Sequence, residues 1–283
     1  MDLDEARALL ADRWDADAEV WESRWAPVFR EFAAEVVRRA ALKPGERLLD
    51  IGTGSGNALL LAAPLLGAEG RAVGIDKSQQ MAERAKRATS SSGPAVKVLQ
   101  MDAAALDFPE GWFDAVVSNC GIPFLGLTDA LAEVRRVLKP GGRFSWAEWH
   151  IDQVAAVRIL DDVLAKHKTQ NPGARLRRLR DALSVWARSA STVSTRVDFE
   201  RALKGLGFSA VQGATVTHTL HSFTLDSFLD ARLSRIVERM ELEEMTPAVR
   251  DAFFVEARAS LAHLDRAGQF EVLWPIFYLT ATK

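Results

Sequence analysis

The feature that most constrains the fold is a short apolar run followed by three glycines. The run from Leu48 to Ile51, interrupted by Asp50, is typical of a buried strand in a parallel sheet. Glycines at alternate positions let the chain turn sharply and let a ligand approach the backbone; they are Gly52, Gly54 and Gly56. A helix predicted directly after them would turn its free N–H groups toward that ligand. The segment therefore predicts a strand–loop–helix unit that binds a nucleoside-like cofactor, with a ligand-free tight turn as the alternative.

The spacing of the glycines narrows the kind of cofactor. A dinucleotide-binding loop follows the pattern G-x-G-x-x-G, and its third glycine would stand where this chain has Asn57. Asp50 precedes the first glycine, and its charge would repel a pyrophosphate but attract an ammonium group. The loop thus favours a cofactor with an ammonium group over a dinucleotide.

Polar side chains follow three further predicted strands. Strands over residues 71–75, 96–101 and 113–118 end at Asp76, Asp102 and Asn119. Ligands of open α/β sheets bind beside the carboxyl ends of the strands, so these side chains are expected near one site. An alternative role for Asp76 is to cap the helix predicted over residues 78–88.

These segments, in this order, resemble the class I S-adenosylmethionine-dependent methyltransferases. A further marker of that family is the run Leu138-Lys139-Pro140-Gly141-Gly142 before a fifth strand over residues 143–149. Within the family the chain is similar to the branch of the ubiquinone and menaquinone biosynthesis C-methyltransferases, over roughly residues 40–150. The resemblance implies an α/β, Rossmann-like fold with a seven-stranded, mostly parallel sheet and an antiparallel last strand. It also implies helices on both faces of the sheet and a helical substrate cover.

The resemblance also implies the cofactor and the residues that bind it. S-adenosyl-L-methionine would be the methyl donor and S-adenosyl-L-homocysteine the product. The glycine loop would hold the amino-acid end, Asp76 the ribose hydroxyls, and Asp102 the adenine. The predicted cofactor-binding residues are Asp50, Gly52, Thr53, Gly54, Gly56, Asp76, Lys77, Met81, Asp102, Ala103 and Asn119.

The rest of the chain is predicted to hold the substrate. We divide it into an N-terminal helical lid (1–41), the cofactor-binding core (42–150), a helical insertion that covers the substrate (151–195), and the remaining sheet with a helical excursion (196–283). Apolar residues recur at helical spacing near the N-terminus, as a core stripe or as part of a lid: Trp14, Trp21, Trp25, Val28 and Phe32. The residues predicted to line the substrate pocket are Trp21, Trp25, Phe124 and Trp149.

Two charged stretches in these outer segments are both predicted to be solvated surface. One is basic, from Lys166 to Arg180, and the other is acidic, from Glu238 to Glu244. A basic helix could instead bind an anionic substrate or a nucleic acid.

The expected reaction is in-line displacement of the methyl group by an oxygen, nitrogen or carbon nucleophile. A base would assist an oxygen nucleophile, and histidine is the side chain that titrates nearest neutral pH. His150 follows the fifth strand, whose end borders the methyl site in the family, so His150 is the predicted catalytic base. Glu148 and Trp149 alternate along that strand, so only one of them can face the pocket.

Composition limits the partners and the location. The chain of 283 residues has 36 basic and 38 acidic side chains, and this balance argues against an extended nucleic-acid surface. A single cysteine excludes a disulfide framework and a thiolate metal cluster, so no metal site is expected. We expect a cytoplasmic monomer or homodimer that acts on an aromatic or apolar small molecule in secondary metabolism. Neither a nucleic acid nor a membrane is an expected partner.

Two other functions remain open from the sequence. One is a nicotinamide-dependent Rossmann oxidoreductase, which Asn57 and the charge of Asp50 disfavour. The other is a protein that binds S-adenosylmethionine without catalysis.

Overall fold

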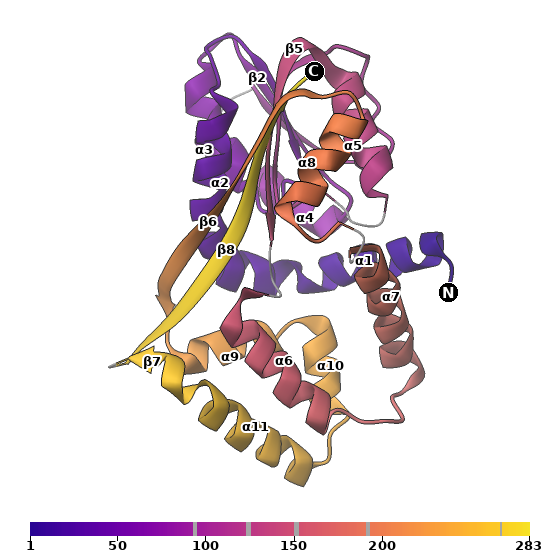
Figure 1. Ribbon diagram of the computed structural model, residues 1–283, viewed down its shortest axis with the longest axis vertical. Helices are drawn as coiled ribbons and strands as arrows, with labels where there is room; N and C mark the ends of the chain where they lie inside the picture. Colours follow the sequence, from indigo (N-terminus) through magenta and orange to yellow (C-terminus); the bar gives the residue numbers. More distant parts are fainter. Residues whose placement is uncertain (93–94, 123–125, 150–152, 191–192, 267) are drawn as a thin grey trace. The chain divides into compact units, whose positions relative to one another are not determined.

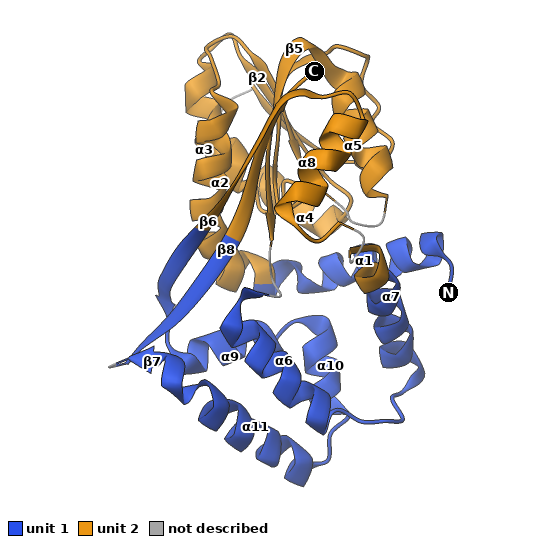
Figure 2. Cartoon of the chain, viewed as in Figure 1, with its two compact units in different colours: residues 1–20, 150–185, 217–275 blue, residues 21–149, 186–216, 276–283 orange. Residues whose placement is uncertain are grey.

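The computed structural model describes residues 1–283 apart from 93–94, 123–125, 150–152, 191–192 and 267. The chain forms two compact units, each assembled from separate segments (Figure 2). Unit 1 contains residues 1–20, 150–185 and 217–275, and unit 2 contains residues 21–149, 186–216 and 276–283. The functional division into lid, core and cover stays a prediction.

One sheet runs in the order β3-β2-β1-β4-β5-β8-β6, with β7 paired to β8 (Figure 1). Neighbouring strands from β3 to β5 pair in parallel, and β8 pairs with β5 in the antiparallel direction. The predicted fold is confirmed, except that the two-residue β7 brings the strands of the sheet to eight in the described part of the chain. The strands are β1 (Arg47–Ile51), β2 (Arg71–Asp76), β3 (Val96–Gln100), β4 (Phe113–Asn119), β5 (Leu138–Trp149), β6 (Ser209–Phe223), β7 (Asp265–Arg266) and β8 (Gln269–Thr282).

Helices of unit 2 cover both faces of its part of the sheet. Helices α2 and α3 lie on one face, and α5 and α8 on the other (Figure 1). The α2 face is sealed by Phe32, Ala33 and Val36, and the α5 face by a cluster that includes Trp146 and Phe199. The helical elements of this unit are the π-helix η1 (Trp21–Trp25), α2 (Ala26–Ala40), α3 (Asn57–Leu66), α4 (Gln79–Ala88), α5 (Leu127–Val137) and α8 (Arg196–Gly205).

Unit 1 is mainly helical. Helix α6 packs on α11, where His167 lies against Phe253 and pairs with Glu256, and α7 packs on α10 through a small apolar cluster. In the described part of the chain, no helix combines the length and the apolar character that a membrane span requires. The helices are α1 (Leu3–Val20), α6 (Ala155–His167), α7 (Ala174–Ala190, which continues into unit 2), α9 (Leu225–Leu233), α10 (Ile236–Glu243), α11 (Pro247–Leu261) and the short 3-10 helix Ala262–Leu264.

The prediction that both charged stretches are solvated is wrong for their inward-facing members. Glu241 is only 4% exposed and pairs with Arg180 of the basic stretch. The Glu238 side chain is 13% exposed and pairs with Arg232. Burial acts to raise the pKa of Glu238, but Arg235 and Arg232 outweigh it, so this pKa is lowered. Arg180 compensates Glu241, and Arg232 and Arg235 compensate Glu238, so charged side chains can be buried in unit 1.

Candidate cofactor-binding site

The glycine loop between β1 and α3 has a backbone that other residues would strain. Gly52, Gly54 and Gly56 have φ values of +64°, +55° and +88°, in the left-handed region. At Gly52 a Cβ atom would lie 2.4 Å from the Cα atom of Gly121, which follows β4. Glycine at position 52 therefore lets the loops after β1 and β4 touch and close one end of the site.

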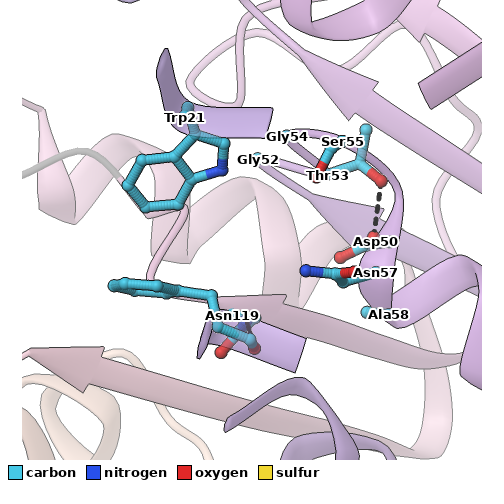
Figure 3. Close-up of a pocket in the computed structure, with 10 residues that line it drawn as sticks. Trp21, Asp50, Gly52, Thr53, Gly54, Ser55, Asn57, Ala58 and Asn119 are labelled. Carbon is cyan, nitrogen blue, oxygen red and sulfur yellow. Dashed lines mark hydrogen bonds between the residues drawn. The ribbon is translucent and has the colours of Figure 1, made fainter. Parts of the chain in front are cut away.

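A hollow of about 310 Å³ lies at this loop (Figure 3). In Figure 3 the ring of Trp21 lies close to Gly52 and Gly54 of the glycine loop, on the far side of the space from Asp50 and Asn57. This volume includes space that is open to solvent. The lining residues are Trp21, Phe29, Asp50, Gly52, Thr53, Gly54, Ser55, Asn57, Ala58 and Asn119.

Asp50 is the buried carboxyl group of this hollow. Its Oδ2 atom accepts a hydrogen bond of 2.6 Å from the Thr53 hydroxyl, and its Oδ1 atom is buried without a partner among the described residues. Burial raises the pKa of Asp50 to about 7; the bond from Thr53 works against this shift and the charge of Asp76 adds to it. A buried oxygen without a hydrogen-bond partner lowers the stability of the fold. A ligand that donates a hydrogen bond to Oδ1 of Asp50 would remove this penalty.

Two asparagines join this site to helix α2. The Nδ2 atom of Asn119 donates to the carbonyl oxygen of Phe29 at 3.0 Å, and Nδ2 of Asn57 donates to that of Ala26 at 2.7 Å. These bonds fix the amide orientation, which leaves the Oδ1 atom of Asn119 buried and without a partner in the described structure. The hollow thus holds a second acceptor that a ligand could use.

An aromatic cluster contacts the same hollow. The ring of Trp21 lies 4.7 Å from that of Phe29 and 6.0 Å from that of Trp149, measured between centroids. Trp149 also packs against Phe29 at 5.1 Å. On β5 it is therefore Trp149 that faces this cluster, while Glu148 is buried.

Asp76, at the end of β2, braces the glycine loop. Its Oδ2 atom accepts from the backbone N–H of Gly54 at 2.9 Å, and its Oδ1 atom accepts from the N–H of Ser78 at 2.9 Å. The N-cap of α4 is Ser78, whose hydroxyl accepts from the N–H of Met81. Asp76 therefore supports the loop and the turn into α4, and its predicted contact with the ribose hydroxyls stays a prediction.

Asp102 follows β3. Its Oδ2 atom pairs with Lys77 at 2.8 Å, and its Oδ1 atom accepts from the N–H of Ala104 at 2.9 Å. Its neighbour Ala103 is buried. Register places Asp76 beside Gln100, so the ends of β2 and β3 are adjacent. These residues lie outside the lining of the hollow, and their predicted role at the adenine stays a prediction.

The structure brings together part of the predicted set and adds to it. Six predicted residues line the hollow, namely Trp21, Asp50, Gly52, Thr53, Gly54 and Asn119. Gly56 serves as the N-cap of α3, Met81 is buried on α4, and Trp25 is 3% exposed in the core. His150 and Phe124 lie outside the described residues. The sequence analysis missed Phe29, Ser55, Asn57 and Ala58.

The unpaired hydrogen-bond acceptors of the hollow fit the amino-acid end of S-adenosylmethionine. The α-ammonium group of that cofactor offers N–H donors and a positive charge to the free oxygens of Asp50 and Asn119. The N-terminus of α3 follows the loop and suits a negative group such as the α-carboxylate. A pyrophosphate, by contrast, would lie against Asp50 and bring no hydrogen-bond donor.

Fold and site together define a Rossmann-like cofactor-binding domain. Its residues 48–142 match the family described as "Methyltransferase domain". The chain is 33% identical, over 139 residues, to a protein of Symbiobacterium thermophilum named demethylmenaquinone methyltransferase. That match covers 48% of this chain and 54% of the relative, so the chain spans about half the length of this relative.

Solved structures show the same fold over most of the chain. Phosphoethanolamine N-methyltransferase 2 of Haemonchus contortus, in complex with phosphomonomethylethanolamine and S-adenosylhomocysteine, matches with a TM-score of 0.56 and 17% identity. The match covers 98% of this chain and 60% of the Haemonchus protein. The [4+2]-cyclase SpnF matches with a TM-score of 0.54 and 19% identity. This match covers 97% of this chain and 94% of the cyclase. Residues 48–142 of this chain thus match a methyltransferase domain, and the solved structures share the fold in which it lies.

Proposed function

We propose that the whole protein transfers the methyl group of S-adenosylmethionine to a small aromatic or apolar molecule by in-line displacement. The observation that carries this proposal is the pair of buried, unpaired oxygens of Asp50 and Asn119 beside aromatic rings. The methyl acceptor is an oxygen, nitrogen or carbon nucleophile. The name of the Symbiobacterium relative, a demethylmenaquinone methyltransferase, supports an apolar ring compound as the acceptor.

When bound, S-adenosylmethionine supplies a methyl group that its sulfonium activates for displacement. Asp50 and Asn119 hold the ammonium group, and Asp76 and Asp102 hold the adenosine half. The rings of Trp21, Phe29 and Trp149 exclude water. The aromatic face of Trp21 also attracts a cation such as the sulfonium. The main task of these residues is alignment of the two reactants.

His150 is our candidate for a base that removes a proton from the acceptor. Glu148, two residues before it, suits that role less well. Burial raises the pKa of Glu148 to about 8, and its oxygens accept from the Trp146 ring N–H and the Trp149 backbone N–H. It is thus predominantly protonated at neutral pH.

The remaining expectations about the whole protein stay predictions. They are a cytoplasmic monomer or homodimer in secondary metabolism, with no nucleic-acid or membrane partner. Residues 1–41 and 151–195 remain our candidates for the lid and the substrate cover.

The test is calorimetry followed by a transfer assay. We expect the purified chain to bind S-adenosylmethionine and S-adenosylhomocysteine but not NADH. A screen with a labelled methyl donor over quinols, phenols and amines should then label one class. Tight NADH binding without S-adenosylmethionine binding would instead indicate an oxidoreductase, and cofactor binding without transfer would favour a non-catalytic binding protein.

A further inference from the structure

An ion pair joins the π-helix η1 to helix α4 within unit 2. Glu22 of η1 pairs with Arg84 of α4, 62 positions further along the chain. The Arg84 side chain is 17% exposed, and its Nε atom is buried without a hydrogen-bond partner among the described residues. This contact lies outside the residues predicted to bind cofactor or substrate.

The residue directly before Glu22 is Trp21, whose ring lines the hollow. The nearest non-neighbouring heavy atom to a Cβ built on Gly54 would be Nε1 of Trp21, at 3.6 Å. The indole therefore stands next to the glycine loop, on the opposite side of the space from Asp50 (Figure 3). A small rotation of η1 would move this ring relative to the loop.

A π-helix is a rare conformation that depends on surrounding contacts and is common at functional sites. At the far end of η1, α2 begins at Ala26 with Pro27 in its first turn, and the carbonyl oxygens of Ala26 and Phe29 accept hydrogen bonds from Asn57 and Asn119. At the near end, the tie to α4 is the Glu22–Arg84 pair. Helix α4 itself starts beside Asp76, which braces the glycine loop.

We propose that the Glu22–Arg84 ion pair is a positioning device that fixes Trp21 over the cofactor loop. It rests on the proposed function, because the ligand of that loop is S-adenosylmethionine or its product. Glu22 acts on the cofactor through the indole and not by touching it. Neutralising Glu22 leaves the mostly buried guanidinium of Arg84 without its ion-pair partner. The contact between η1 and α4 is then weaker, so the indole of Trp21 is no longer fixed beside the glycine loop.

The test is a double-mutant cycle on S-adenosylhomocysteine binding, followed by calorimetry. E22Q should weaken binding roughly two- to fivefold, the range of a partly exposed ion pair. W21A should weaken it more, and E22Q should have no further effect in the W21A protein. E22R/R84E, which reverses the pair, should recover most of the affinity that E22Q loses. E83Q is the matched control, because Glu83 lies next to Arg84 on α4 and accepts a bond from Gln79.

Each outcome bears on one statement. An equal loss from E22Q with and without Trp21 would overturn the positioning role, and so would wild-type affinity in E22Q. A loss in E83Q as large as that in E22Q would show a general effect of charge on α4 and also overturn it. Absence of binding by the wild-type chain would instead refute the proposed function.

Discussion

At the scale of single residues, the protonation of Asp50 should control cofactor affinity. Its pKa is raised to about 7 in the free protein, mainly by burial. An ammonium group favours the charged carboxylate, so binding lowers this pKa and releases a proton. We therefore expect the affinity for S-adenosylhomocysteine to rise between pH 5 and pH 7, by at most about tenfold per pH unit, and then to level off. Calorimetry in buffers of different ionisation enthalpy measures both the affinity and the proton release.

The D50N variant is the control for this pH dependence. It should bind S-adenosylhomocysteine roughly 10- to 100-fold more weakly at pH 7.5, because it loses a charge-assisted hydrogen bond. Its affinity should also vary little between pH 5 and pH 7. An unchanged pH profile in D50N would show that another group is responsible.

Gly52 should be irreplaceable for a reason that its backbone angle alone does not explain. Both Gly52 and Gly45 have left-handed φ values, +64° and +84°, but a Cβ on Gly45 meets nothing within 4 Å. G45A should therefore cost about 1–2 kcal/mol of unfolding free energy, from the angle alone. G52A should cost about 3 kcal/mol or more, because it adds the clash with Gly121. Urea unfolding compares the two, and equal losses would contradict the close approach of the loops.

At the scale of elements, the start of α4 holds one residue with a structural role and one that we predict to bind the cofactor. Ser78 caps the helix, whereas Asp76 ties the glycine loop to it. S78A should lower the free energy of unfolding by about 1 kcal/mol and leave S-adenosylhomocysteine affinity within about twofold. D76A should weaken that affinity roughly 10- to 100-fold, because it removes the loop support and the predicted ribose contact. Urea unfolding and binding calorimetry on both variants test this prediction. If D76A bound S-adenosylhomocysteine as tightly as S78A does, Asp76 would not belong to the site.

The same scale shows what a sequence can and cannot reveal. Strand ends that carry Asp50, Asp76 and Asn119 were predictable, because a buried strand is a short apolar run and glycines mark the turn after it. The π-helix was not, and the ion pair that joins it to α4 links Glu22 to Arg84, 62 positions away. Asn57 attracted notice only as a missing glycine, although its amide holds helix α2. Contacts between residues far apart in sequence leave no local pattern.

At the scale of the whole molecule, the mostly parallel sheet with an antiparallel last strand was predictable, but the division into units was not. Parallel strands joined by crossover helices permit few arrangements, so the resemblance to the family was enough to predict this type of sheet. Each unit instead gathers several separate segments of the chain, and unit 1 buries a charge network that looked like surface. The sequence predicts a charged run to be solvated because it does not show where the opposite charge lies. For Arg180 that charge is Glu241, 61 positions further along the chain.

The charge network of unit 1 leads to the last prediction. Arg232 is 6% exposed and pairs with Glu238 and Asp161, so R232M leaves the mostly buried Glu238 without this partner. This should lower the free energy of unfolding by about 3 kcal/mol, since removal of one member of a buried pair is strongly destabilising. R232M/E238M should be more stable than R232M, because no charge of the pair is then left behind. R258M is the matched control: Arg258 pairs with Asp226 in the same unit but is half exposed, so its loss should cost less than about 1 kcal/mol. Urea unfolding of the three variants decides, and equal costs for R232M and R258M would mean that burial adds nothing to the role of Arg232.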